Sequence, residues 1–193
     1  MELKLPTQEQ LRVIYNRDMR EAFPADEMKT LTWMRKMWAE GRYRPYCLFD
    51  GEEIVGEAFL WLGHPSWALL DFLCVTASRR NDGLGVVIQK ALLEAEPSGT
   101  VIFGEAEDPA HAPDPALAAR RMEFYHRNGW RDSGYASDIF GVRYQGLYLA
   151  EHPVDTAELI AEHQYVYRTS MSPKVCRRFI RIPWDPGYQT PKN

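Results

Sequence analysis

Apolar residues in the first third of the chain recur first at helical and then at extended spacing. Helical spacing predicts a helix over residues 7–22, with Thr7 as its N-cap, and a second helix over residues 26–40. Two strand-like runs follow, over residues 46–49 and 54–62. Because Asp50-Gly51 stands between these runs and Asp-Gly is a strong turn signal, we expect them to form a β-hairpin.

The central third contains a nearly unbroken apolar run over residues 68–75, interrupted by Asp71. Such a run is typical of a strand that is buried on both faces. A turn that contains glycines and a helix with one apolar face come next. The further predicted elements are a strand over 100–107, a loop over 108–115, a helix over 115–128 and one or two strands within 135–150.

This order of helices and strands predicts an α/β or α+β domain with a mixed sheet over residues 1–150. We interpret residues 151–193 as a C-terminal extension that packs on this domain or trails from it. The extension is expected to begin with a helix capped by Asp155 and to end, from Pro183 on, in a proline-containing strap or loose tail.

Composition narrows the classes of function. The 193 residues carry a formal net charge of −4, which argues against a nucleic-acid partner and is compatible with a cationic small substrate. We find neither a signal peptide nor an apolar run near the roughly 20 residues of a membrane span, so we expect a cytoplasmic protein with no membrane partner. The three cysteines and five histidines show no metal-site spacing, so we expect no metal.

The sharpest motif is Arg80-x-x-Gly83-x-Gly85, which stands between the apolar strand and the following helix. A helix N-terminus carries unpaired N–H groups and a partial positive charge, and glycines allow close approach, so this turn could seat a pyrophosphate. A tight turn without a ligand is the alternative. Because no Lys-Ser/Thr pair and no third glycine follow, the motif fits neither a P-loop nor a dinucleotide fingerprint.

Together with Val75, this motif resembles the acetyl-CoA signature of the GNAT superfamily of N-acyltransferases. The later run Arg120-Arg121-Met122-Glu123-Phe124-Tyr125-x-x-x-Gly129-Trp130 is similar to a second block of that family. The two blocks occur in the family's order and at about its spacing, and the resemblance covers roughly residues 7–150. It implies a mostly antiparallel central sheet flanked by helices.

The resemblance also implies how acetyl-CoA, the acyl donor, would be held. The pantetheine arm would lie along the backbone of Leu73, Cys74 and Val75. The pyrophosphate would rest on the loop formed by Arg80, Asn81, Asp82, Gly83, Leu84 and Gly85. Many members have an asparagine where this chain has Ala118, a departure for which Arg120 or Arg121 could compensate.

Acetyl transfer to an amine needs a base for the amine, a donor for the oxyanion and an acid for the leaving thiolate. The resemblance points to Tyr125 as the general acid, with core packing as the alternative. A backbone N–H near Cys74 or Val75 would stabilise the oxyanion. Glu105 and Glu107 share one face of a predicted strand end, so one could act as base and both would titrate as a coupled pair; a solvated strand end is the alternative.

Three further residues are candidates for binding the acceptor. Asp71 interrupts a buried run, where an acid must be paired, so it either contacts the acceptor or forms a structural salt bridge. Phe23 and Glu27 fall in the region where the family binds its acceptors, although a helix break explains them equally. Cys74 could in principle carry the acetyl group, but a small buried core residue is the simpler reading.

We therefore expect an enzyme that moves an acetyl group from acetyl-CoA to a primary amine of a small molecule. A peptide or protein acceptor stays open, as does a homodimer. A non-catalytic acyl-CoA-binding regulatory module is the alternative from another class, because a fold that holds a cofactor does not prove chemistry. A plain α/β scaffold without a cofactor is the third hypothesis.

Overall fold

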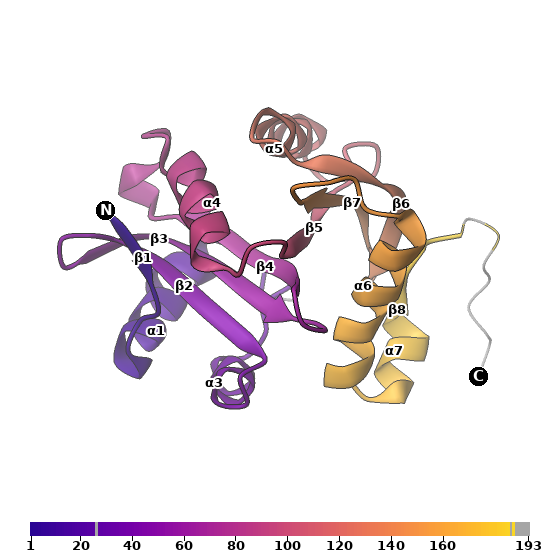
Figure 1. Cartoon of the computed structure of the whole chain (residues 1–193), viewed down its shortest axis with the longest axis horizontal. Helices are drawn as coiled ribbons and strands as arrows, with labels where there is room; N and C mark the ends of the chain where they lie inside the picture. Colours follow the sequence, from indigo (N-terminus) through magenta and orange to yellow (C-terminus); the bar gives the residue numbers. More distant parts are fainter. Residues whose placement is uncertain (26, 186, 188–193) are drawn as a thin grey trace. The chain divides into compact units, whose positions relative to one another are not determined.

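The computed structural model describes residues 1–25, 27–185 and 187, and the chain forms two compact units. The first unit contains Met1–Leu62 and Leu70–Thr100, and the second contains Gly63–Leu69 and the described residues from Val101 on. Figure 1 draws the first unit from indigo to magenta and most of the second from red to yellow.

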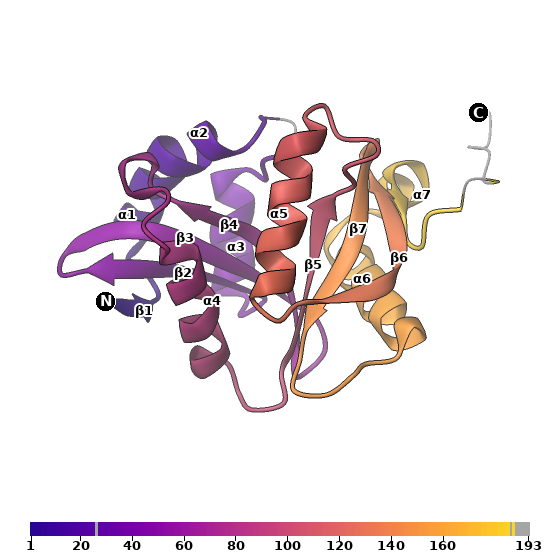
Figure 2. The same cartoon turned by 90° about the horizontal axis from the view of Figure 1, so that it is seen from above.

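The first unit is a sheet with helices on both of its faces. Its elements are β1 (Glu2–Lys4), α1 (Gln8–Ile14), the π-helical turn η1 (Tyr15–Met19), α2 (Arg20–Ala22), α3 (Leu31–Ala39), β2 (Tyr43–Asp50), β3 (Glu53–Leu62), β4 (Trp67–Val75), the 3₁₀ turn η2 (Ala77–Arg79) and α4 (Leu84–Ala95). The strand order is β1-β2-β3-β4, with β1, β2 and β3 antiparallel. Helix α4 covers one face, and α1 and α3 cover the other (Figures 1 and 2).

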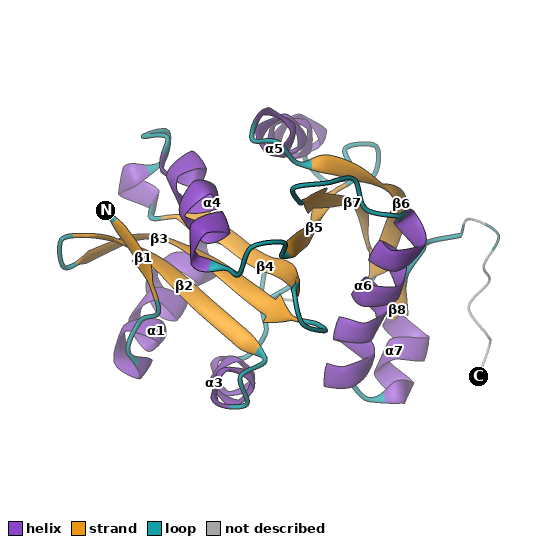
Figure 3. Cartoon of the chain, viewed as in Figure 1, coloured by secondary structure: helices purple, strands orange, loops and turns teal. Residues whose placement is uncertain are grey.

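The second unit repeats this layered plan with different elements. They are β5 (Val101–Glu107), α5 (Pro115–Arg127), β6 (Arg131–Ile139), β7 (Val142–Leu149), α6 (Thr156–Ser170), α7 (Pro173–Phe179) and β8 (Ile180–Arg181). The strand order is β5-β7-β6-β8, and every pairing is antiparallel. Helix α5 lies on one face and α6 on the other (Figures 2 and 3).

The expected fold class is confirmed: the chain is mixed α/β, with mostly antiparallel strands flanked by helices. The helix predicted over 7–22 forms as α1, η1 and α2, and Thr7 caps it by accepting a hydrogen bond from the Gln10 amide. The hairpin at Asp50-Gly51 is also confirmed, and Gly51 adopts the left-handed conformation that its turn requires.

The second predicted helix begins later than the sequence pattern indicated. Its predicted start at Asp26 lies outside the described residues, and α3 begins at Leu31. The physical reason is a better cap, because the Thr30 hydroxyl accepts a hydrogen bond from the Trp33 amide at 3.2 Å. The short elements α7 and β8 were not predicted; α7 spans only Pro173–Phe179, and a two-residue strand such as β8 leaves no periodic pattern.

Strand β4 departs from regular alternation at Asp71 and Phe72. Asp71 contacts Lys29 and Tyr43, whereas Phe72 packs edge-on against Phe59 with 6.4 Å between ring centroids. Tyr43 and Phe59 are themselves in ring contact at 5.9 Å. Two consecutive side chains therefore lie on the same face of the sheet, where a regular strand would alternate them.

The described part of the C-terminal extension packs within the second unit. Strand β8 pairs with β6, and the Thr156 hydroxyl at the start of α6 donates a hydrogen bond to the carbonyl of Ser133 at 2.9 Å. The loose tail expected after Pro183 falls largely outside the described residues, and the domain boundary at residue 150 stays a prediction.

Across the part of the chain that the structure describes, no helix is long and apolar enough to cross a membrane.

Candidate functional site

The loop from Arg80 to Gly83 connects β4 and η2 to helix α4 in the first unit. Asn81 and Gly83 both adopt left-handed backbone conformations, with φ of 72° and 77°. Gly83 is the N-cap of α4, and a Cβ atom built on it would meet no atom within 4 Å. The backbone of the loop is therefore open at the N-terminus of a three-turn helix, where amide groups and the helix dipole favour an anion.

Two consecutive arginines flank this loop and have different roles. Arg79 is bound to the loop itself, with its Nε 3.0 Å from the Asp82 carboxylate and a second contact to Asp50 at 3.3 Å. Arg80 donates to the Val75 carbonyl at 3.4 Å and pairs with Glu21 at 3.3 Å, yet its side chain is 47% exposed. Because exposed ion pairs are weak, the Arg80 guanidinium can exchange Glu21 for a phosphate.

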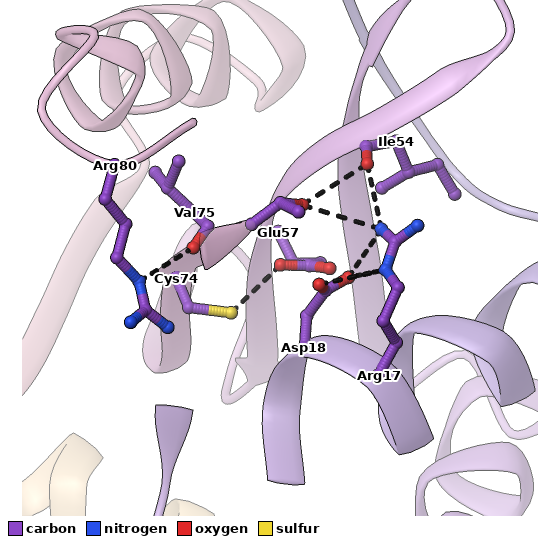
Figure 4. Close-up of polar contacts among 8 residues, drawn as sticks. Arg17, Asp18, Ile54, Glu57, Cys74, Val75 and Arg80 are labelled. Atoms are coloured by element: carbon purple, nitrogen blue, oxygen red, sulfur yellow. Dashed lines mark hydrogen bonds and ion pairs between the residues drawn. The ribbon is translucent and has the colours of Figure 1, made fainter. Parts of the chain in front are cut away.

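A buried polar cluster lies where β4 ends and this loop begins (Figure 4). The Cys74 thiol donates to the Glu57 carboxyl group at 2.9 Å. On the other side of Glu57 stands Asp18 from η1, held by Arg17, which donates to it at 2.6 Å and to the Ile54 carbonyl at 2.9 Å. Asp18 is 5% exposed and Glu57 is 1% exposed, so two acids share one buried site beside a single cation.

A proton on one of the two carboxyl groups removes the charge repulsion between Glu57 and Asp18. Burial raises the pKa of Glu57 well above its ordinary range, and the neighbouring Asp18 raises it further, partly through a hydrogen bond between the two carboxyl groups. Glu57 Oε1 is buried and finds no ordinary donor in the described chain, which a proton shared with Asp18 explains. The raised pKa favours the protonated form of Glu57, whereas Asp18 is paired with Arg17.

The same surroundings determine the state of Cys74. Burial and then the adjacent Glu57 raise the pKa of the Cys74 thiol well above its usual range. A protonated thiol is a poor nucleophile, so the raised pKa favours the interpretation of Cys74 as a half-buried packing residue over its interpretation as an acetyl carrier.

Asp71 is paired inside the first unit. Its carboxylate contacts the Lys29 ammonium at 2.5 Å and accepts a hydrogen bond from the Tyr43 hydroxyl at 2.6 Å. Its side chain is only 4% exposed. Asp71 therefore forms the structural salt bridge that was the alternative to a contact with the acceptor. Of the other two acceptor candidates, Phe23 packs edge-on against Phe72 at 4.8 Å, and Glu27 is half-buried.

In the second unit, Glu105 belongs to a side-chain network that sequence reasoning did not identify. His163 Nε2 lies 2.8 Å from Glu105 Oε1, and the Tyr167 hydroxyl donates to Glu105 Oε2 at 3.0 Å. The other ring nitrogen of His163 lies 3.0 Å from the Tyr135 hydroxyl. The sequence did contain one indication of this network, because His163 is a polar residue on the apolar face of α6, beside Leu159 and Val166.

Glu107 has a different partner, although it stands on the same strand as Glu105. Its carboxylate accepts a hydrogen bond from Arg121 of α5 at 2.7 Å. The two glutamates were expected to act as a coupled pair, but one contacts α6 and the other contacts α5. Arg121, expected to contact the cofactor, carries this ion pair while remaining 45% exposed.

Tyr125 lies in α5 among aromatic side chains. Its ring contacts Phe124 and Trp130, with centroids 5.5 and 5.0 Å away. Burial raises the pKa of Tyr125 to about 12, opposed by the charge of Arg121. The phenol is therefore protonated at neutral pH, as a proton donor must be. On the same helix, Ala118 is fully buried.

No cluster of three or more His, Cys, Asp or Glu side chains suited to a metal ion occurs among the described residues.

We predict that Glu57→Gln flattens the loss of stability at alkaline pH. The folded chain keeps a proton that the unfolded chain releases above the ordinary value of 4.5, so wild-type stability should fall as pH rises from there towards the raised pKa. The glutamine amide can donate a hydrogen bond to Asp18 and accept one from Cys74, and it has no proton that titrates in this pH range. Thermal unfolding measured by circular dichroism from about pH 5 to about pH 9 checks the slope.

Glu53, exposed on the same strand, provides the control, and Glu53→Gln should keep the wild-type slope. A Glu57→Gln variant that loses stability with pH as steeply as the wild type would show that the acid pair holds no proton.

We also predict that Asp71→Asn destabilises the fold by about 3 kcal/mol, because it leaves the half-buried Lys29 ammonium without its counter-charge. The double variant Lys29→Met/Asp71→Asn removes both charges and should recover most of this loss. Urea unfolding of the three proteins gives the free energies of unfolding. Equal losses in the single and double variants would contradict the prediction.

No protein-family model and no curated protein matches the chain. Many solved structures do match it. A protein of Bacteroides thetaiotaomicron assigned to the GNAT family of acetyltransferases superposes with a TM-score of 0.67 at 19% identity, covering 87% of this chain and 100% of that one. The ribosomal-protein-S18-alanine N-acetyltransferase of Escherichia coli superposes with a TM-score of 0.57 at 17% identity, covering 79% of this chain and 94% of that one.

An aminoglycoside 6′-N-acetyltransferase complexed with coenzyme A gives a TM-score of 0.56 at 14% identity, covering 80% of this chain and 99% of that one. These superpositions extend over nearly the whole length of each known protein. The chain therefore has the GNAT fold of the N-acetyltransferases.

Proposed function

We propose that the chain is an N-acetyltransferase that moves an acetyl group from acetyl-CoA to a primary amine of a small molecule. The observation that carries the proposal is the open loop at the start of α4, with left-handed Asn81 and Gly83 and the exposed guanidinium of Arg80. The fold supports it, since one structure that the chain resembles holds coenzyme A.

The residues around the loop suit the donor. The amides at the N-terminus of α4 would receive the pyrophosphate, with Arg80 supplying a positive charge. The backbone of Leu73, Cys74 and Val75 would hold the pantetheine arm. The polar cluster around Glu57 keeps the Cys74 end of β4 fixed. This favours cofactor binding because little conformational entropy is lost when the cofactor binds. Arg121 is proposed as a further contact, since its guanidinium is 45% exposed and can contact the cofactor while it keeps its ion pair with Glu107.

The chemistry divides between a base and an acid. The amine nitrogen attacks the thioester carbon, and Glu105 accepts the amine's proton through a water molecule. As the tetrahedral intermediate collapses, the C–S bond breaks and the Tyr125 hydroxyl gives its proton to the leaving sulfur. The products are the acetylated amine and CoA with its free thiol, and solvent exchange returns the proton from Glu105 and restores Tyr125.

We assign the base to Glu105 because the carboxylate of Glu107 is already neutralised by Arg121. The Glu105 side chain is 15% exposed, so it can still receive a proton from water. The acceptor is proposed to be a cationic small molecule, in keeping with the net charge of −4. Phe23 and Glu27 remain proposed acceptor contacts, whereas Asp71 is occupied by Lys29.

We predict that Gly83→Ala weakens CoA binding about tenfold or more, because a side chain at φ 77° strains the loop and narrows the phosphate seat. Isothermal titration calorimetry with CoA measures the affinity. Gly41 is a matched control, since it is also left-handed, at φ 71°, and has no atom within 4 Å of an added Cβ.

Gly41→Ala should introduce the same backbone strain and keep the affinity for CoA within about twofold of the wild-type value. If both variants bind CoA as the wild type does, the loop is not the pyrophosphate seat, and the proposal fails at its first step.

We predict that Tyr125→Phe lowers kcat about 10²–10⁴-fold while CoA affinity changes little, because phenylalanine keeps the ring contacts with Phe124 and Trp130 and removes only the proton donor. Steady-state kinetics with calorimetry separates the two effects. Turnover at the wild-type rate in this variant would assign Tyr125 a packing role alone.

A further inference from the structure

His163 is a fully buried histidine whose two ring nitrogens both have polar partners. It lies in α6, where Nε2 faces Glu105 Oε1 at 2.8 Å and Nδ1 faces the Tyr135 hydroxyl at 3.0 Å. Phe103 covers the ring, with 5.5 Å between centroids. The arrangement is a chain of three groups, from β6 through α6 to β5, that ends on the proposed base.

We assign a direction to these hydrogen bonds from the chemistry of the partners. Burial, and then the charge of Glu105, raise the pKa of Tyr135 well above its usual range, so its hydroxyl keeps its proton. When that hydroxyl donates to Nδ1, the neutral imidazole carries its proton on Nε2 and donates it to Glu105. Tyr167 donates to the second carboxylate oxygen, so each oxygen of Glu105 receives one hydrogen bond.

We propose that His163, oriented by Tyr135, is a positioning residue that holds Glu105 as a carboxylate in one fixed direction for accepting the amine's proton. This inference rests on the proposed function, in which Glu105 is the base. The groups that titrate or carry charge around His163 are Glu105 from β5, Tyr135 from β6 and Tyr167 from α6 itself.

A packing role would not require this arrangement. A buried imidazole costs free energy unless both of its nitrogens are satisfied, and an aliphatic side chain would fill the same space without that demand. The chain also offers an internal comparison on the same helix. Glu162 pairs with His64 at 2.8 Å, but that histidine is half-exposed and stacks on Tyr165. In the buried pair, the Tyr135 hydroxyl lies 3.0 Å from the second ring nitrogen of His163.

The decisive variant is Tyr135→Phe, which keeps the ring and removes the donor to Nδ1. We expect kcat to fall about tenfold, with the acidic limb of the pH–rate profile displaced and the KM for acetyl-CoA within about twofold of wild type. His163→Gln, which retains an N–H near the position of Nε2, should keep more activity than His163→Leu. Glu162→Gln, which breaks the exposed pair on the same helix, should leave rate and profile unchanged.

A second readout does not depend on turnover. Imidazole ¹⁵N chemical shifts should show the wild-type His163 ring neutral and protonated on Nε2, and Tyr135→Phe should shift the population towards the other tautomer. A wild-type ring protonated on Nδ1 overturns the inference. So does a Tyr135→Phe enzyme with a wild-type pH–rate profile. A wild-type protein that acetylates no amine overturns the proposed function itself, whatever the tautomer of His163.

Discussion

The burial of Glu57 beside Asp18 is the constraint on which the first unit depends. Two buried acids beside one arginine leave a negative charge uncompensated unless one acid is neutral, and an uncompensated buried charge costs several kcal/mol. Once Glu57 is protonated, the cluster joins η1, β3 and the end of β4 through Arg17, Asp18 and Cys74. The loop that we propose for the pyrophosphate leaves β4 at this anchored end, so its geometry is set before any ligand arrives.

The second unit also holds an acidic side chain, that of Glu105, within a polar network. The Glu105 carboxyl group lies between two partners, with His163 Nε2 2.8 Å from one oxygen and the Tyr167 hydroxyl donating to the other. Tyr135 in turn fixes the histidine. Helix α6, the first helix of the C-terminal extension, supplies His163 and Tyr167 to this network. Each unit, taken by itself, contains one ordered polar feature: an open loop beside Arg80 in the first and the network around Glu105 in the second.

Local pattern was enough to predict most helices and strands, the Asp50-Gly51 turn and the loop before α4, because spacing and glycine placement act over a few residues. It could not predict the polar networks. Cys74 and Glu57 are 17 positions apart, and His163 and Glu105 are 58 apart, so their contacts depend on which strands and helices pack together. The pairing of Glu107 with Arg121, rather than with Glu105, was missed for the same reason.

The central claim is that the chain catalyses acetyl transfer to an amine, and amine-dependent release of CoA tests it most directly. Purified protein is incubated with acetyl-CoA and each of a panel of cationic amines, with the free thiol and the acetylated amine both quantified. The account predicts that at least one amine produces thiol and acetylated product in equal amounts, at a rate well above that without protein. Tight binding of CoA with no acceleration by any amine would contradict it and would favour a non-catalytic acyl-CoA-binding module.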